Sequence, residues 1–149
     1  MRAVVQRVSD ASVEVEGRIC GAVEAGLLVY LGVDREDGEA DVAYLADKVR
    51  HLRIFPDEND RMNLDVVQAN GKVLAVSAFT VQADARRGRR PTLESAAPQD
   101  RAVVLYEQFC DTLAHGGVQV ERGSFGDYMN VKCTNAGPIC ILLDSRRNF

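Results

Sequence analysis

Long apolar runs, paired cysteines, histidines and excess positive charge are scarce in this 149-residue sequence, and each scarcity argues against a class of protein. No apolar run approaches the ~20 residues that a membrane-spanning helix requires. The N-terminal stretch, Met1–Arg7, is charged again by its seventh residue and does not resemble a secretory signal. We therefore expect a soluble, cytoplasmic protein with no membrane partner.

The cysteines and histidines give no indication of a metal site or of a catalytic triad. The four cysteines include no C-x-x-C pair, so we expect reduced thiols, no bound metal and no other cofactor. They are Cys20, Cys110, Cys133 and Cys140. The two histidines, His51 and His115, lie near the ends of predicted helices and outside any recognisable triad motif. A Ser-His-Asp hydrolase is therefore not expected.

The net charge of −4 argues against general affinity for nucleic acid. One short stretch departs from this balance, because it carries four arginines without an intervening acid. They are Arg86, Arg87, Arg89 and Arg90. Such a stretch is either an ordinary solvated loop or a local patch for phosphate groups, and the sequence leaves both interpretations open.

Length and composition predict one domain covering residues 1–149, with 46% hydrophobic and 27% charged residues. In the first part of the chain, a period-two alternation at Val13 and Val15 is typical of a half-buried strand. Leu27–Leu31 is apolar throughout and predicts a central strand covered on both faces. Two hairpins with a turn at Gly17 are expected from strands at Ala3–Val8, Ser12–Glu16, Ile19–Val23 and Leu27–Val33.

Two helices are expected. The first runs over Glu39–Leu52, capped by Asp37 or Gly38, with apolar residues every three or four positions. The second is opened by Pro98 and ended by Gly116-Gly117. Its predicted inner face consists of Ala102, Leu105, Tyr106, Phe109 and Leu113.

The remaining segments complete an α/β prediction. Pro56–Asp60 is a turn, and Asn70-Gly71 predicts a hairpin between Val66-Val67 and a strand at Val73–Val81. The arginine-rich loop Gln82–Ala97 is long for a simple connection, which favours a functional role. Closing strands are expected at Val118–Val120, Met129–Thr134 and Ile139–Leu143. We expect a strongly curved, mostly antiparallel sheet or barrel flanked by two helices.

Two short segments carry the strongest functional signal. Asn135-Ala136-Gly137-Pro138 lies between two predicted strands, where Gly137 permits close backbone approach and Pro138 fixes φ. Such a loop presents backbone carbonyls rigidly, although an ordinary turn would have the same sequence. The second segment, Ser77–Val81, ends an apolar strand with two hydroxyl groups, those of Ser77 and Thr80. Either hydroxyl is a candidate nucleophile or is simply satisfied within the strand.

Together with further ordered matches along nearly the whole chain, these segments resemble the D-aminoacyl-tRNA deacylase family. The other matches are Gln6–Val8, Ala11–Val13, Ala25–Val29, Leu31–Val33, Arg53–Phe55, Met62–Leu64, Arg89–Pro91, Phe125 and Met129. Two departures reduce side-chain hydrogen bonding. The family usually has Gln where this chain has Ala78, and it ends the second motif with Val-Thr where this chain has Ile139-Cys140.

The resemblance implies a homodimeric hydrolase that cleaves the ester of D-aminoacyl-tRNA without a metal or cofactor, as chiral proofreading in translation. It implies that the terminal 2′-hydroxyl of the tRNA assists, and that the N–H groups of Phe79 and Thr80 stabilise the oxyanion. Gly137-Pro138, in cis, would enter the partner's pocket and exclude L side chains, while glycine would escape exclusion. Arg7 would donate to a carbonyl of that loop, or is merely a surface cation.

The resemblance also places the terminal adenosine against Phe125 and Met129, although core packing would explain Met129 nearly as well. Ala78 and Asn135 are further candidate substrate contacts. Two alternatives stay open. Thr80 could act as a covalent nucleophile, or the chain could be a non-catalytic tRNA-binding dimer whose site has decayed at Ala78 and Cys140.

Overall fold

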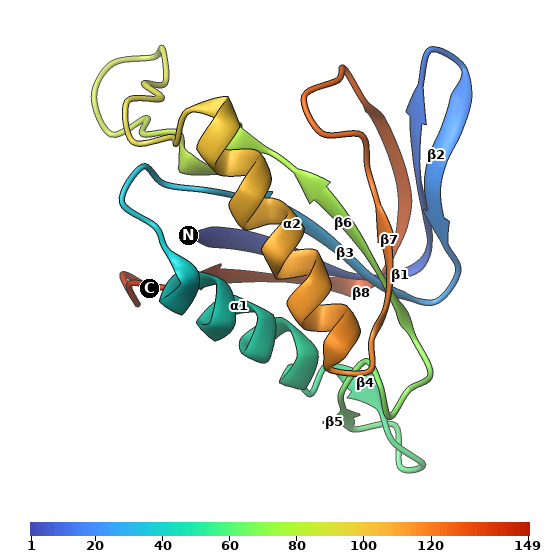
Figure 1. The fold of residues 1–149 in the computed structure, drawn as a ribbon. Coiled ribbons are helices and arrows are strands. Elements are labelled where there is room, and N and C mark those ends of the chain that lie inside the picture. The colour runs from blue at the N-terminus through green and yellow to red at the C-terminus, as the bar shows by residue number, and fades with distance from the viewer.

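A six-stranded curved sheet carries both helices on one of its faces (Figure 1). The computed structural model describes residues 1–149. The strands are β1 (Arg2–Val15), β2 (Arg18–Val23), β3 (Gly26–Gly32), β6 (Lys72–Ser77), β7 (Gln119–Arg122) and β8 (Asn130–Asp144), and a small second sheet pairs β4 (Phe55–Pro56) with β5 (Met62–Leu64). The helices are α1 (Glu39–His51), the 3₁₀-helix η1 (Phe79–Gln82) and α2 (Gln99–His115). No helix has the length and apolarity that crossing a membrane would require.

The sheet is mixed, with three antiparallel and two parallel ladders, which confirms the expectation of a mostly antiparallel sheet and adds a parallel part. The strand order is β2-β1-β3-β6-β7, and β8 also pairs with β1. All ladders of β1 are antiparallel, but β6 runs parallel to both β3 and β7. Parallel neighbours require long crossover connections, and α1 and α2 lie within these two connections. The sheet curves until β2 approaches β7, and a Cβ at Gly21 would lie 2.4 Å from the Arg122 carbonyl oxygen.

The first two predicted strands are in fact one long strand, β1. Its residues 2–8 pair with β3, whereas residues 11–15 pair with β2, so the strand bends from one neighbour to the other. The predicted turn at Gly17 is present, with positive φ at Glu16 and Gly17. The turn predicted at Gly17 was therefore correct. The break expected at residues 9–11, between the first two predicted strands, was wrong.

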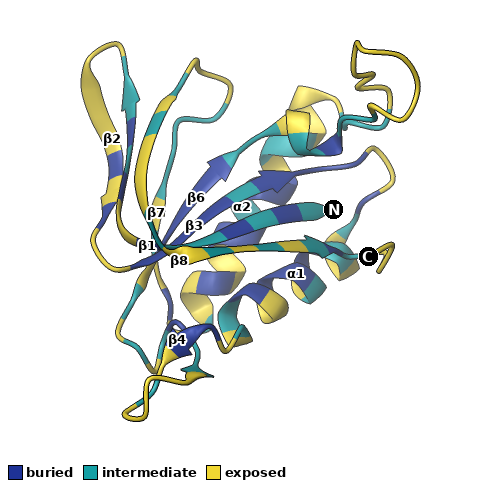
Figure 2. Cartoon of the chain, turned by 180° about the vertical axis from the view of Figure 1, so that it is seen from behind, coloured by how far each residue is buried: buried dark blue, intermediate teal, exposed yellow.

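The apolar positions divide between two cores on the two faces of the sheet. Leu27, Val29 and Leu31 of β3 face the larger core under the helices, and Leu28 faces the smaller one. This confirms the prediction of a central strand covered on both sides, which Figure 2 shows as a mostly dark ribbon. The helices bury most of the expected stripes, namely Val42, Leu45, Ala46 and Val49 in α1 and Leu105, Tyr106, Phe109 and Leu113 in α2. In α2, Cys110 is buried in addition, and the expected Ala102 is only partly buried. Gly38 and Pro98 are their N-caps.

Two local predictions were wrong. No hairpin forms at Asn70-Gly71, because residues 66–70 are turns and the following strand, β6, pairs in parallel with β3. The Asp65 carboxylate accepts the N–H groups of Val67 and Gln68, which bends the chain locally instead. The predicted strand Val73–Val81 ends at Ser77, and η1 follows. The Pro56–Asp60 turn is confirmed as the connection between β4 and β5.

Candidate functional site

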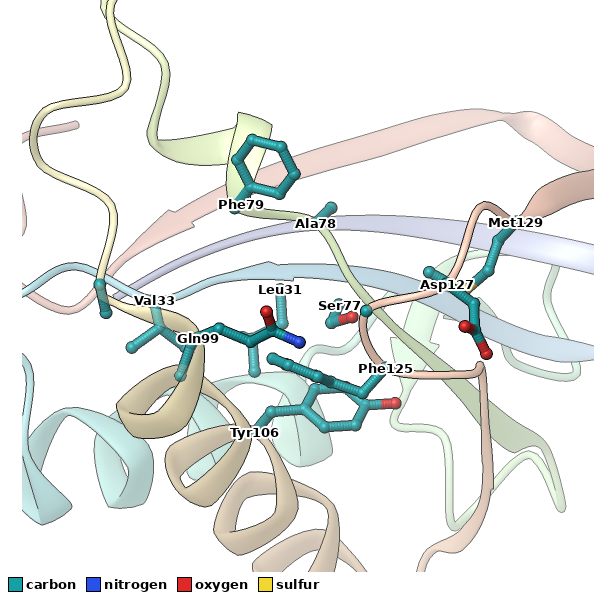
Figure 3. Close-up of a pocket in the computed structure, with 13 residues that line it drawn as sticks. Leu31, Val33, Ser77, Ala78, Phe79, Gln99, Tyr106, Phe125, Asp127 and Met129 are labelled. Carbon is teal, nitrogen blue, oxygen red and sulfur yellow. The ribbon is translucent and has the colours of Figure 1, made fainter.

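A cavity of about 260 Å³ opens where β6 ends, bordered by η1, the first turns of α2 and the segment between β7 and β8 (Figure 3). Nine of its thirteen lining residues are hydrophobic, as is typical of ligand pockets. The lining includes five of the residues predicted for the site, and these are Ser77, Ala78, Phe79, Phe125 and Met129. The structure thus gathers residues from two segments that are about fifty positions apart in sequence.

The N-terminal end of η1 presents unpaired peptide groups beside this cavity. The Ala78 N–H donates to the Leu31 carbonyl at 2.8 Å and so continues the β3–β6 ladder. The first hydrogen bond of η1 runs from the Val81 N–H to the Ala78 carbonyl at 3.0 Å. The N–H groups of Phe79 and Thr80 lie between these bonds and have no partner in the helix. Phe79 lines the cavity, whereas the exposed Thr80 does not.

Two aromatic rings form the wall of the cavity on the α2 side. Tyr106 donates its hydroxyl to the Ala75 carbonyl at 2.9 Å, and its ring centroid lies 5.6 Å from that of Phe125 at a tilt of 46°. Burial raises the pKa of Tyr106 well above its usual value, so this hydroxyl stays a donor. Tyr106 therefore holds Phe125 in place. Met129 lines the cavity and also packs against the smaller core, so both interpretations of it describe real contacts.

No imidazole reaches the cavity. The His51 ring contacts the Asp47 carbonyl and the Arg50 guanidinium at the end of α1. His115 is the last residue of α2, at the opposite end of that helix from Gln99. Ser77 lines the cavity without a histidine beside it. The only charged side chain in the lining is Asp127, whose carboxylate accepts the Ser124 hydroxyl. The arrangement therefore lacks a base of the kind that activates a serine nucleophile.

The Asn135–Pro138 segment bulges out of the β1–β8 ladder. Gln6 pairs with Cys140 and Val8 pairs with Asn135, so four residues of β8 lie opposite the single residue Arg7. The predicted loop is thus present, although the strand continues on both sides of it. The Gly137–Pro138 peptide bond is cis.

Two side chains brace this bulge from within the same chain. Arg7 donates from Nε to the Ala136 carbonyl at 2.8 Å and from a terminal nitrogen to the Ile54 carbonyl at 2.7 Å. The amide of Asn135 accepts from the Ile139 N–H at 2.7 Å and donates to the Ile139 carbonyl at 3.0 Å. Both polar atoms of Asn135 are therefore engaged by the loop itself, so within one chain it acts as a brace.

Apart from Thr80, the predicted site residues fall into two separate groups. The first group lines the cavity, and the second group, Arg7, Asn135, Gly137 and Pro138, does not contribute to its lining. Gly137 and Pro138 are exposed on β8, which has a partner strand, β1, along only one edge (Figure 2). A single chain therefore does not bring the Gly-Pro bulge to its own cavity.

The arginine-rich loop stands at the same end of the molecule as η1 and the first turn of α2 (Figure 1). Its base is closed by mutual backbone hydrogen bonds of 2.9 Å between Asp84 and Thr92. Arg86 is paired with Asp84, with a closest separation of 2.6 Å, and hydrogen bonds from Arg86 hold the pKa of Asp84 well below its usual range. Arg87, Arg89 and Arg90 are exposed and form none of the ion pairs of the chain, so they carry the free positive charge of the loop.

Sequence reasoning did not single out several cavity residues. Leu31 and Tyr106 were predicted only as core residues, and Gln99 and Asp127 were not considered. The position of Leu31 beside the end of β6 was readable only with the β3–β6 register, in which Leu31 pairs with Ser77. For Gln99, the available signal was its place directly after Pro98, at the start of a predicted helix.

Comparisons with known proteins identify relatives of this chain. Residues 4–144 match the family model described as D-Tyr-tRNA(Tyr) deacylase. The chain is 54% identical to a D-aminoacyl-tRNA deacylase of Koribacter versatilis and 50% identical to one of Thermosipho africanus, in both cases over 100% of each chain.

Solved structures show the same fold. A c-Myc DNA unwinding element binding protein superposes with a TM-score of 0.91 at 34% identity, covering 97% of this chain and 98% of that one. A probable eukaryotic D-amino acid tRNA deacylase gives a TM-score of 0.81 at 15% identity, covering 95% and 97%. The full-length matches and the shared fold show that the chain belongs to the D-Tyr-tRNA(Tyr) deacylase family of enzymes.

Proposed function

We propose that this protein hydrolyses the ester bond of D-aminoacyl-tRNA and releases free tRNA and the D-amino acid, as a cytoplasmic step of translation quality control. The observation that carries the proposal is a cavity with unpaired peptide N–H groups at its edge and no imidazole, in a chain of the deacylase family. Such a site suits a substrate that is already activated, because it can orient an ester and stabilise charge without a side-chain base.

The chemistry divides between substrate and protein. The 2′-hydroxyl next to the ester organises the attacking water, and the N–H groups of Phe79 and Thr80 stabilise the oxyanion that develops on the carbonyl. One such donor typically contributes ~2.7–4 kcal/mol to transition-state stabilisation. Because this role belongs to the backbone, the methyl side chain of Ala78 does not weaken it.

The cavity receives the terminal adenosine of the tRNA. Phe125 offers an aromatic face held by Tyr106, and base–aromatic stacking contributes about 1–3 kcal/mol. Arg87, Arg89 and Arg90, at the same end of the molecule, contact phosphates of the acceptor stem, which position the substrate without reading its sequence. Arg86 contributes less, because Asp84 already neutralises it.

Handedness is sensed in a homodimer. Strand β8 offers a free edge over 15 residues, and exposed long edges of this kind are sites of association. Each protomer places its Gly137-Pro138 bulge at the partner's cavity, where the carbonyls crowd the face of Cα that an L side chain would occupy. Discrimination can be achieved by a clash with the wrong substrate as well as by added contacts to the right one, and here the clash rejects the L side chain. Glycine has no side chain to clash, so glycyl-tRNA is also hydrolysed.

The direct test compares D-Tyr-tRNA with L-Tyr-tRNA. We expect rapid deacylation of the D-ester, little of the L-ester and measurable turnover of Gly-tRNA, all unchanged after dialysis against EDTA. Equal hydrolysis of the two tyrosyl esters, or of neither, would contradict the proposal. Binding of tRNA without turnover would instead support a non-catalytic dimer.

Thr80 provides the test of the covalent alternative. A Thr80→Ala variant keeps its peptide N–H, so we expect its kcat to stay close to that of the wild type. A near-total loss of kcat with intact tRNA binding would favour a covalent threonine nucleophile. The position of Thr80 outside the cavity lining supports the first outcome.

A further inference from the structure

Gln99 is the only residue with a side-chain amide among those lining the cavity. It is the first residue of α2, and its amide points across the cavity toward Phe125 and Ser77 (Figure 3). The Nε2 atom lies against the opposite segment, since a Cβ at Gly126 would be 2.9 Å from it. Neither the nitrogen nor the oxygen of this amide forms a hydrogen bond within the chain, and Gln99 is exposed to solvent.

The other polar groups of the lining are already hydrogen-bonded, or carry donor and acceptor on one oxygen atom rather than on two adjacent atoms. The Tyr106 hydroxyl donates to the Ala75 carbonyl, and the Asp127 carboxylate accepts the Ser124 hydroxyl. Ser77 offers a single hydroxyl, and Ala78 adds only a methyl group. Gln99 is therefore the one side chain in the cavity that presents a free donor and a free acceptor side by side.

Adenine presents the complementary pair. Its exocyclic amine is a donor, and a ring nitrogen acceptor lies beside the amine on both hydrogen-bonding edges. Glutamine amides pair with adenine through two such bonds, and unstacked RNA bases are commonly read on these edges while stacked on aromatic side chains. The cavity supplies both parts, since Phe125 and Tyr106 form an aromatic wall and the Gln99 amide projects in front of it.

We infer that Gln99 reads the base of the terminal nucleotide and selects adenine. The adenine amine donates to Oε1 of Gln99, and Nε2 of Gln99 donates to the neighbouring ring nitrogen. This inference rests on the proposed function, because it takes the cavity to hold the 3′-terminal adenosine. It makes Gln99 a specificity-determining residue that contacts the base and takes no part in ester cleavage.

The test uses two D-tyrosylated tRNAs that differ only in the terminal base, adenine or unsubstituted purine, which lacks the exocyclic amine. Loss of one hydrogen bond should lower kcat/KM of the wild type for the purine substrate by about two- to tenfold. Gln99→Ala should hydrolyse both substrates with equal kcat/KM, below that of the wild type on purine, because the variant loses both hydrogen bonds to the base whereas purine loses only one. The effect should appear in KM rather than in kcat.

Gln108→Ala is the matched control, because it removes the same side chain from the same helix outside the cavity. We expect it to keep the wild-type ratio between the two substrates, and a general disturbance of α2 would also leave that ratio unchanged. The inference is overturned if the wild type does not distinguish adenine from purine, or if Gln99→Ala retains the wild-type ratio. Failure of the wild type to hydrolyse either D-ester would instead contradict the proposed function.

Discussion

Arg7 illustrates how one side chain can hold a loop that is distant in sequence. Its guanidinium donates to the carbonyls of Ala136 and Ile54, which lie 129 and 47 residues from Arg7 in the sequence. Arg7→Ala leaves both carbonyls without this donor, so we expect a loss of about 1–3 kcal/mol in the free energy of unfolding. Arg7→Lys should recover only part of it, because an ammonium group lacks the planar fork.

Urea unfolding of these Arg7 variants measures the loss. Arg18→Ala is the control, since Arg18 is exposed on β2 and forms no ion pair, and such substitutions usually stay within about 0.5 kcal/mol. An Arg7→Ala variant as stable as the wild type would show that the bulge does not depend on this contact.

The cysteines should differ sharply in reactivity. Burial is the main cause that raises the pKa of Cys110 to about 11, so this thiol stays protonated at neutral pH. Cys20, Cys133 and Cys140 are exposed. Because the thiolate is the reactive form, we expect iodoacetamide at pH 8 to label Cys20 rapidly in the folded protein and Cys110 only after unfolding, with Cys133 and Cys140 of β8 labelled more slowly than Cys20 in the proposed dimer.

Mass spectrometry before and after denaturation reads the labelling out. Rapid native labelling of Cys110 would contradict the packing of α2. Slow labelling of Cys133 and Cys140 relative to Cys20 would indicate that the exposed side of β8 is covered in solution.

At the scale of elements, the end of β8 is held by a carboxylate. Asp144 accepts the Arg146 N–H at 2.9 Å and the Asn148 amide at 2.7 Å, and Arg2 lies 3.4 Å away. Burial alone would raise the pKa of Asp144, but these hydrogen bonds and the positive charge of Arg2 outweigh it and lower the pKa. A lowered folded-state pKa means that Asp144 stabilises the fold above its unfolded pKa of about 4, and that this stabilisation disappears as pH falls further.

Asp144→Asn should therefore cost about 1–3 kcal/mol at pH 7, and its difference from the wild type should shrink below pH ~4. Urea unfolding at several pH values measures this, with Glu24→Gln as a control on an exposed carboxylate that forms no ion pair. A difference that stays constant down to pH 3 would show that the charge of Asp144 is not the stabilising feature.

Elements were predicted well where one local signal was sufficient. Periodicity located both helices to within one residue at their N-terminal ends, because each buries a single apolar stripe against the sheet. The Asn70-Gly71 hairpin was wrong because the same dipeptide also ends a compact turn, and strand direction depends on the partner rather than on the turn alone. The continuity of β1 was missed because its bend is imposed by two different neighbours, β2 and β3.

At the scale of the whole molecule, the proposal depends on whether the Gly-Pro bulge acts on its own cavity or on that of a second copy. Two variants distinguish these arrangements. Pro138→Ala keeps an open cavity and should also hydrolyse L-Tyr-tRNA. Ala78→Trp fills the cavity and should be inactive, but it carries an intact bulge.

Adding a large excess of Ala78→Trp to Pro138→Ala forms mixed dimers in which open cavities face intact bulges. We therefore expect hydrolysis of L-Tyr-tRNA to fall nearly to the wild-type level, while hydrolysis of D-Tyr-tRNA persists. Sedimentation of the mixture verifies that the subunits have exchanged. An L-esterase rate unaffected by the added protein would show that selection does not cross between subunits.

The sequence by itself determined the family, the helices, the apolar core and the two motifs, because these depend on residue type and on spacing along one segment. Tertiary structure alone decided the strand directions, the gathering of Ser77, Phe125 and Gln99 around one cavity, and the separation of Gly137-Pro138 from it. The physical reason is that a cavity is defined by long-range register. Here the parallel pairing of β3 with β6 and the crossover through α2 bring its walls together, and no local pattern specifies those pairings.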